Sequence, residues 1–105
     1  MDRVEVDTLV ETVRTVIRSY ATWGYNNAGE RRKLYYVENS EEQIFGVVDQ
    51  YDPGSKEATL VLMARIVNEH VVIDEDKTSV SLIGELEKVG IPASQITLAW
   101  RSKTP

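Results

Sequence analysis

Three groups of side chains in this 105-residue chain could take part in chemistry: one histidine, one run of acids, and one basic run beside aromatic rings. His70 is the single histidine, and it stands between a predicted turn and the start of a predicted strand. Base catalysis by histidine needs a nucleophile and an orienting carboxylate within hydrogen-bond reach, and only a folded structure can bring them there. We therefore interpret His70 as a surface turn residue and predict no catalytic residue.

The acidic run Asp74-Glu75-Asp76 follows a β-branched run at residues 71–73. Carboxylate oxygens are the ligands that hard cations prefer, so such a run could bind a metal in principle. It lacks the alternating acids, the central glycine and the spaced terminal glutamate of an EF-hand loop. We interpret it as a solvated acidic turn. The sequence also lacks dinucleotide-binding, P-loop, zinc-protease and serine-hydrolase motifs, and we expect no metal and no cofactor.

The basic run at residues 31–33 is the one place where cationic and aromatic side chains gather. This combination is typical of grooves that bind single-stranded nucleic acid. Tyr35 and Tyr36 of the strand that follows must point to opposite faces, so at most one of them could join such a groove. Because Trp, Tyr and Arg are also the usual anchors of protein interfaces, we favour a protein partner there. The candidate interaction surface consists of Trp23, Tyr25, Arg31, Arg32, Lys33, Trp100 and Arg101.

Composition limits the class of protein. The net charge is −5, which argues against a free-standing nucleic-acid binder, since such proteins need a surplus of cations to neutralise phosphates. With no cysteine there is no disulfide, thiolate nucleophile or zinc–thiolate site. No apolar run approaches the roughly 18–20 residues that a membrane span needs, and the N-terminus resembles no targeting signal. We expect a cytoplasmic protein that does not contact a membrane.

Helical periodicity marks two of the elements that must position these residues. Apolar side chains recur at steps of three and four through residues 4–21 and again through residues 82–89. Thr78 or Ser79 could cap the start of the second helix, and Gly90 is suited to end it. We therefore predict one N-terminal helix and a second helix just before the last strand.

Stretches rich in apolar and β-branched residues predict a sheet. The third strand is apolar on both faces, which is typical of a central strand that is covered on both sides. It should form a hairpin with the second strand. Either the two helices cover opposite faces of the sheet, or they share one face and a partner subunit covers the other. The predicted strands are residues 34–37, 44–51, 58–67, 71–73 and 95–100.

These elements together predict an α+β fold, with a single domain over residues 1–105 and an antiparallel-rich sheet of about five strands. Two glycines inside the elements have structural interpretations. Gly46 is expected to mark a bulge or a close approach of backbones, and Gly84 to let the second helix lie near the sheet.

The last third of the chain contains Thr78, Glu85-Leu86, Val89-Gly90-Ile91-Pro92 and Ile96-Thr97-Leu98. With these motifs as its most specific part, the chain resembles in its order of elements the XisI family, small proteins known as controlling factors for excision of the fdxN element in cyanobacteria. Two departures stand out: the family's C-terminal Gly-Phe-His-Pro-Pro is replaced from Ala99 onward, and its Gly- and Trp-containing hairpin is replaced around residues 49–52. Any role of that C-terminal histidine is therefore not transferred.

The resemblance implies a regulatory, non-enzymatic accessory protein that acts through protein–protein contacts in excision of a DNA element. Its implied partner is an XisH-like, nuclease-related protein or a site-specific recombinase, and self-association into a homo-oligomer stays open. Two alternatives also stay open. One is a small enzyme or ligand-binding module with a pocket near Trp23, Tyr25 and Arg31, and the other is direct DNA binding through residues 31–33.

Overall fold

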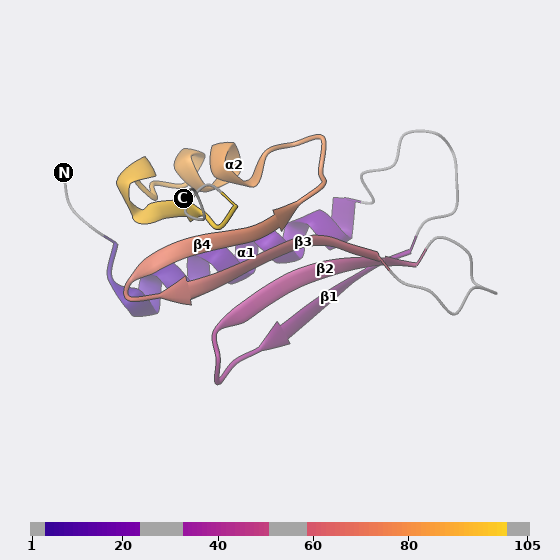
Figure 1. Cartoon of the computed structure of the whole chain (residues 1–105), viewed down its shortest axis with the longest axis horizontal. Coiled ribbons are helices and arrows are strands. Elements are labelled where there is room, and N and C mark those ends of the chain that lie inside the picture. The colour runs from indigo at the N-terminus through magenta and orange to yellow at the C-terminus, as the bar shows by residue number, and fades with distance from the viewer. Residues whose placement is uncertain (1–3, 24–32, 51–58, 101–105) are drawn as a thin grey trace.

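Two α-helices, one short 3-10 helix and five strands make up the described part of the chain, residues 4–23, 33–50 and 59–100 of a computed structural model. Figure 1 shows how they are arranged. In chain order they are α1 (Val6–Trp23), β1 (Lys33–Asn39), β2 (Ile44–Gln50), β3 (Thr59–Val67), β4 (His70–Asp76), α2 (Leu82–Lys88), η1 (Ala93–Gln95) and β5 (Ile96–Leu98).

The strands form one sheet in the order β1-β2-β3-β4-β5. Neighbouring strands are antiparallel up to β4, and β5 pairs in parallel with β4. A parallel neighbour needs a crossover connection, which α2 and η1 supply here. The predicted α+β class, the antiparallel pairing of the second and third strands and the central place of the third strand are confirmed.

Both helices lie on the same face of the sheet. Leu9, Val13 and Ile17 recur at four-residue steps along α1 and are fully buried, in one core with Phe45 of β2 and Leu86 of α2. Helix α1 contacts β1, β2 and α2, and in Figure 1 it lies behind the strands. This excludes the arrangement with the helices on opposite faces of the sheet. The apolar outer side of β3 is therefore not covered by either helix.

Strand β4 is longer than the sequence predicts. It runs from His70 to Asp76, so the acidic run interpreted as a turn belongs to a strand, and that interpretation is wrong. Pairing with β3 continues through Met63 opposite Glu75 and Leu62 opposite Asp76. The cross-strand partners that β3 provides outweigh the low intrinsic strand preference of acidic residues.

Helix α2 also begins differently from the prediction. Its N-cap residue is Ser81, which makes no side-chain cap bond, so a cap at Thr78 or Ser79 is wrong. The Leu82 N–H donates instead to Oδ2 of Asp76 at 2.9 Å. Oδ1 of Asp76 accepts from the Thr78 N–H at 3.0 Å and from the Thr78 hydroxyl at 2.6 Å. The carboxylate that ends β4 thus shapes the turn and satisfies the first turn of α2.

Candidate interaction surfaces

The candidate surface predicted from the sequence is described only in part. Trp23 ends α1, Lys33 begins β1, and Trp100 lies in the turn after β5 with 49% of its surface exposed. Because β1 and β5 are opposite edges of the sheet, four strand spacings or about 19 Å separate them. Lys33 and Trp100 therefore belong to different surfaces. Four members lie outside the described residues, as does most of the alternative pocket: Tyr25, Arg31, Arg32 and Arg101.

His70 lies at the start of β4, next to the turn from β3. Its Nδ1 is 2.8 Å from the carbonyl oxygen of Asn68, so the ring donates to the turn backbone. Asn68 and Glu69 both have positive φ, which places them in the left-handed region that a tight two-residue turn requires. This local bond holds the imidazole against the turn, while His70 itself is the first residue of β4 and half-buried.

The three acids at the end of β4 have separate partners. Asp74 pairs with Arg65, Asp76 holds the start of α2, and the Glu75 carboxylate lies 4.0 Å from Nζ of Lys77. Within residues 4–23, 33–50 and 59–100, no group of three or more His, Cys, Asp and Glu side chains could hold a metal. These acids therefore act in local structure.

The sheet face away from the helices carries apolar side chains. Strand residues alternate between faces, so the neighbours of buried Phe45 and Val47 on β2 point outward, as do alternate residues of the paired strands. Val37, Val67 and Tyr35 are 44%, 39% and 39% exposed. Further apolar residues on this outer face are partly buried: Ile44, Val48, Met63 and Val72. We call these seven residues the outer sheet surface.

One ion pair crosses the outer sheet surface. Arg65 of β3 donates from Nε to Oδ2 of Asp74 at 2.7 Å and from Nη2 to Oδ1 at 2.9 Å. These two parallel bonds raise the pKa of Arg65, and the fork geometry fixes both side chains in one orientation. The outer sheet surface therefore carries the oriented Arg65–Asp74 ion pair among its apolar side chains.

A second ionic network joins α1 to the edge strand β1. Arg14 donates to both carboxylate oxygens of Glu38, at 2.9 and 2.8 Å. The Tyr36 and Ser40 hydroxyls donate to the same carboxylate at 2.6 and 2.8 Å. The hydrogen bonds from Arg14, followed by those from Tyr36, lower the pKa of Glu38 to about 2. The Arg18 guanidinium adds a cation–π contact, 4.9 Å from the centre of the Tyr36 ring.

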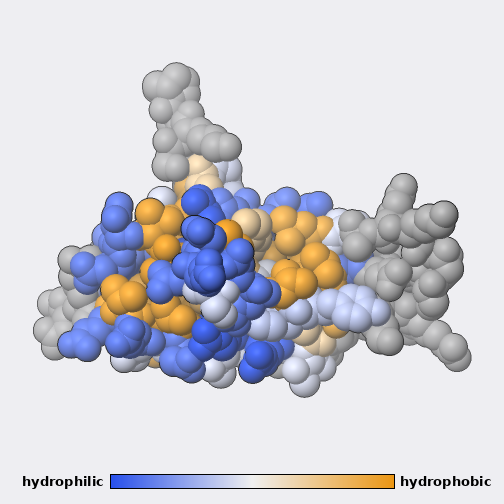
Figure 2. All heavy atoms as spheres, turned by 90° about the horizontal axis from the view of Figure 1, so that it is seen from below, coloured by the Kyte–Doolittle hydropathy of each residue, from blue (hydrophilic) through white to orange (hydrophobic). Residues whose placement is uncertain are grey.

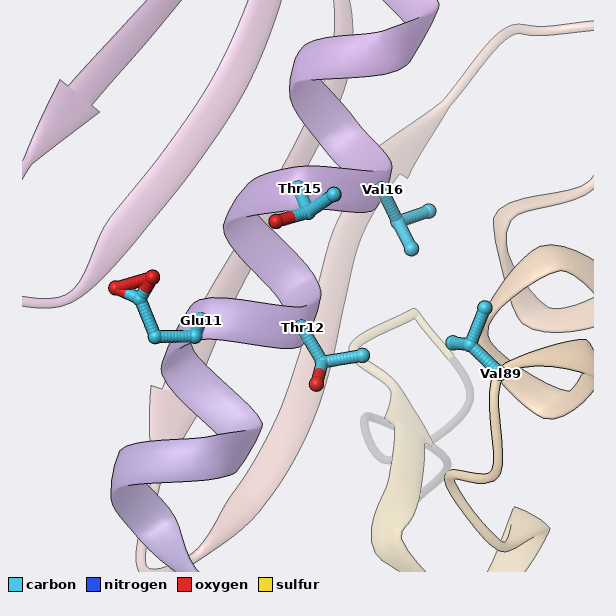
Figure 3. Close-up of a pocket in the computed structure, with 5 residues that line it drawn as sticks. All are labelled: Glu11, Thr12, Thr15, Val16 and Val89. Carbon is cyan, nitrogen blue, oxygen red and sulfur yellow. The ribbon is translucent and has the colours of Figure 1, made fainter.

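An open groove of about 280 Å³ lies between the two helices. Figure 3 shows Val16 of α1 and Val89, just after α2, facing each other across it. Val89 is 53% exposed, and Glu11, the one ionisable residue in the lining, pairs with Arg14. Such a groove can accept an apolar side chain of a partner. Thr12 and Thr15 complete the lining.

Sequence reasoning did not single out the exposed valines, although a signal for two of them was present. The apolar alternation that predicted a two-sided β3 already placed Val67 on the second face. In β1 the same alternation places Val37 on the face opposite to Tyr36 and Glu38, which are partly buried. Val89 was assigned to the apolar stripe of α2, and its exposure depends on how α2 meets α1.

Comparison with known proteins decides the family. The family described as XisI protein matches residues 1–105, the whole chain. The chain belongs to the XisI family. This confirms the resemblance drawn from the helix and strand at residues 78–98. No curated protein matches the chain.

Two solved structures share the fold of this XisI-family chain. One is the fdxN element excision controlling factor XisI from Anabaena variabilis ATCC 29413, with 20% identity and a TM-score of 0.69 over 88% of this chain and 83% of that one. The other is a XisI-like protein from the same organism, with 15% identity and a TM-score of 0.75 over 90% of this chain and 85% of that one. At this level of identity the likeness establishes the fold.

No helix in the described part of the chain is long and apolar enough to cross a membrane. The longest, α1, spans 18 residues and carries Asp7, Glu11, Arg14 and Arg18.

Proposed function

We propose that this XisI-family protein is a non-enzymatic accessory subunit that acts through protein–protein contacts in the excision of a DNA element. Its partner is an XisH-like, nuclease-related protein or a site-specific recombinase. The family match over the whole chain supports the link to excision. The observation that carries the mode of action is the outer sheet surface.

The outer sheet surface differs from the usual solvated face of an antiparallel sheet. Such a face usually carries polar side chains, in alternation with the apolar ones of the core. On the outer sheet surface β2 contributes Ile44 and Val48, and β3 contributes Met63 and Val67. Apolar side chains that are gathered on an uncovered face are typical of a protein interaction site. A partner would bury them and use the Arg65–Asp74 pair to set its orientation.

The surface beside β1 is of mixed character. In Figure 2, which views the molecule from below Figure 1, apolar side chains form separate groups divided by a hydrophilic band. A surface of this kind resembles a non-obligate interface, in which apolar anchors are surrounded by polar groups. It fits a partner that binds and dissociates.

The test is reconstitution with each partner class. The purified full chain is mixed with an XisH-like protein or a recombinase from the same host, and complexes are detected by light scattering after size exclusion. Val67→Glu places a charge in the outer sheet surface, and we expect it to abolish the complex. Val89→Glu changes an equally branched, exposed side chain on the helix side and should leave the complex intact.

Three outcomes would each contradict a different part of the proposal. If neither partner class binds the wild-type chain, the accessory role is wrong. If Val89→Glu abolishes binding and Val67→Glu does not, the partner uses the helix groove, and the outer sheet surface is the wrong site. If the chain alone binds DNA at low salt and loses binding when residues 31–33 are neutralised, it acts directly on DNA.

A further inference from the structure

The edge strand β1 has the features of a strand that pairs with another chain. In the described part of the chain β1 has one neighbour, β2, whereas its outer side faces no strand. Proteins normally protect such edges with short strands, prolines, bulges or outward charges. The opposite edge follows this rule, because β5 has only three residues.

Strand β1 lacks these protections. It has seven residues without proline, and its pairing with β2 runs from Lys33 opposite Gln50 to Asn39 opposite Ile44 without a register shift. Its internal charge, Glu38, is held on the helix side by Arg14 and is 14% exposed. Lys33 stands at the end of the strand. The edge is therefore long and regular, and within residues 4–23, 33–50 and 59–100 no strand pairs with its outer side.

We propose that the partner on this edge is a second copy of the chain, paired antiparallel through β1 about a two-fold axis at Tyr36. This inference is independent of the proposed function. In an antiparallel pair, directly opposite residues lie on the same face. Because faces alternate along a strand, the two-fold axis of a symmetric β1 pair must pass beside one residue and not between two. Centring on Tyr36 places Tyr35 of each copy opposite Val37 of the other, so that the four exposed apolar side chains contact one another in two cross-strand pairs.

The other symmetric registers fit less well. Centring on Tyr35 places Val37 opposite Lys33, and centring on Val37 places Tyr35 opposite Asn39. With the axis at Tyr36, Lys33 faces Asn39 and Glu38 faces Leu34, so no like charges meet. Aromatic residues opposite β-branched ones are among the favourable cross-strand pairs. Because opposite residues share a face, both cores lie on the same side and the two five-stranded sheets form one continuous sheet.

Mass measurement tests the dimer. Sedimentation of the full chain over a concentration series should show a species of twice 11.9 kDa. Val37→Lys should raise the dissociation constant of the dimer by about tenfold or more, because the substitution occurs twice in each dimer. Val67→Lys is the control, since Val67 is similarly exposed but lies on β3. A wild-type chain that stays monomeric at about 1 mM overturns the proposal.

Cross-linking tests the register. The chain has no cysteine, so any disulfide reports on introduced residues only. A mixture of the Tyr35→Cys and Val37→Cys variants should cross-link on mild oxidation, because directly opposite residues suit disulfide geometry. Val37→Cys alone should cross-link poorly, since the two copies of residue 37 are then diagonal and roughly 7–8 Å apart. Rapid cross-linking of Val37→Cys alone, or equal cross-linking of Val89→Cys, overturns this register.

Discussion

The side chain of Gln95 hydrogen-bonds to both backbone groups of Val4, 91 residues away. The Val4 N–H donates to Oε1 and the Gln95 amide donates to the Val4 carbonyl, each at 2.9 Å. The same amide donates to the Glu69 carbonyl at 2.9 Å. Gln95 is 1% exposed, so it joins the segment before α1, the β3–β4 turn and the entry to β5 at a buried point.

This contact makes Gln95 important for stability. Gln95→Ala removes three hydrogen bonds and leaves backbone groups unsatisfied, so we expect a loss of about 2–3 kcal/mol in the free energy of unfolding. Gln95→Glu should be at least as damaging at neutral pH, since a carboxylate cannot donate to the two carbonyls. Protonation of the introduced carboxylate restores a donor, so the loss of stability in Gln95→Glu should shrink as pH falls. Urea unfolding followed by circular dichroism measures both. An unchanged free energy of unfolding in Gln95→Ala would contradict the inference.

The Arg14–Glu38 pair predicts acid sensitivity. The pKa of Glu38 falls from an ordinary 4.5 to about 2 in the folded state, mainly through hydrogen bonds from Arg14. A lowered pKa stabilises the fold fully above the ordinary value, and this contribution disappears as pH falls from 4.5 towards 2. Glu38→Gln should reduce stability near neutral pH and flatten the pH dependence in that window. Urea midpoints across the range test this, and an unchanged slope in Glu38→Gln would refute it.

The start of α2 offers a paired comparison. Asp76→Ala removes the acceptor for the Leu82 N–H and both Thr78 bonds, so we expect a loss of about 1–2 kcal/mol. Ser81→Ala should be nearly neutral, although Ser81 occupies the N-cap position, because it makes no cap bond. Thermal or urea unfolding of both variants is the measurement. A larger cost for Ser81→Ala than for Asp76→Ala would show that the cap is misassigned.

Two glycines should respond in opposite directions to alanine. At Gly46 an added Cβ would lie 2.9 Å from the Leu62 carbonyl oxygen, so Gly46→Ala must displace β3 and should destabilise the sheet. This confirms the close approach expected there. At Gly84 a Cβ would meet nothing within 4 Å. Gly84→Ala should therefore stabilise α2 by up to about 1 kcal/mol, and the idea that Gly84 permits close packing on the sheet is wrong. Unfolding midpoints of the two variants, compared with wild type, provide the check.

The sequence by itself determined the local elements. The four-residue spacing of Leu9, Val13 and Ile17 indicated α1, and the two-sided apolar pattern of residues 58–67 indicated a central strand. These signals are readable because helical and strand periods are properties of neighbouring residues. The specific run from Thr78 to Leu98 was also sufficient for the family.

Only the tertiary structure decided where distant residues meet. It placed both helices on one face of the sheet, turned the acids of residues 74–76 into strand and cap, and brought Gln95 to Val4. The exposure of Val37 and Val67 likewise depends on which face α1 covers. Such outcomes follow from how separate elements pack, and residues that are far apart in the chain leave no local pattern that reports their contact.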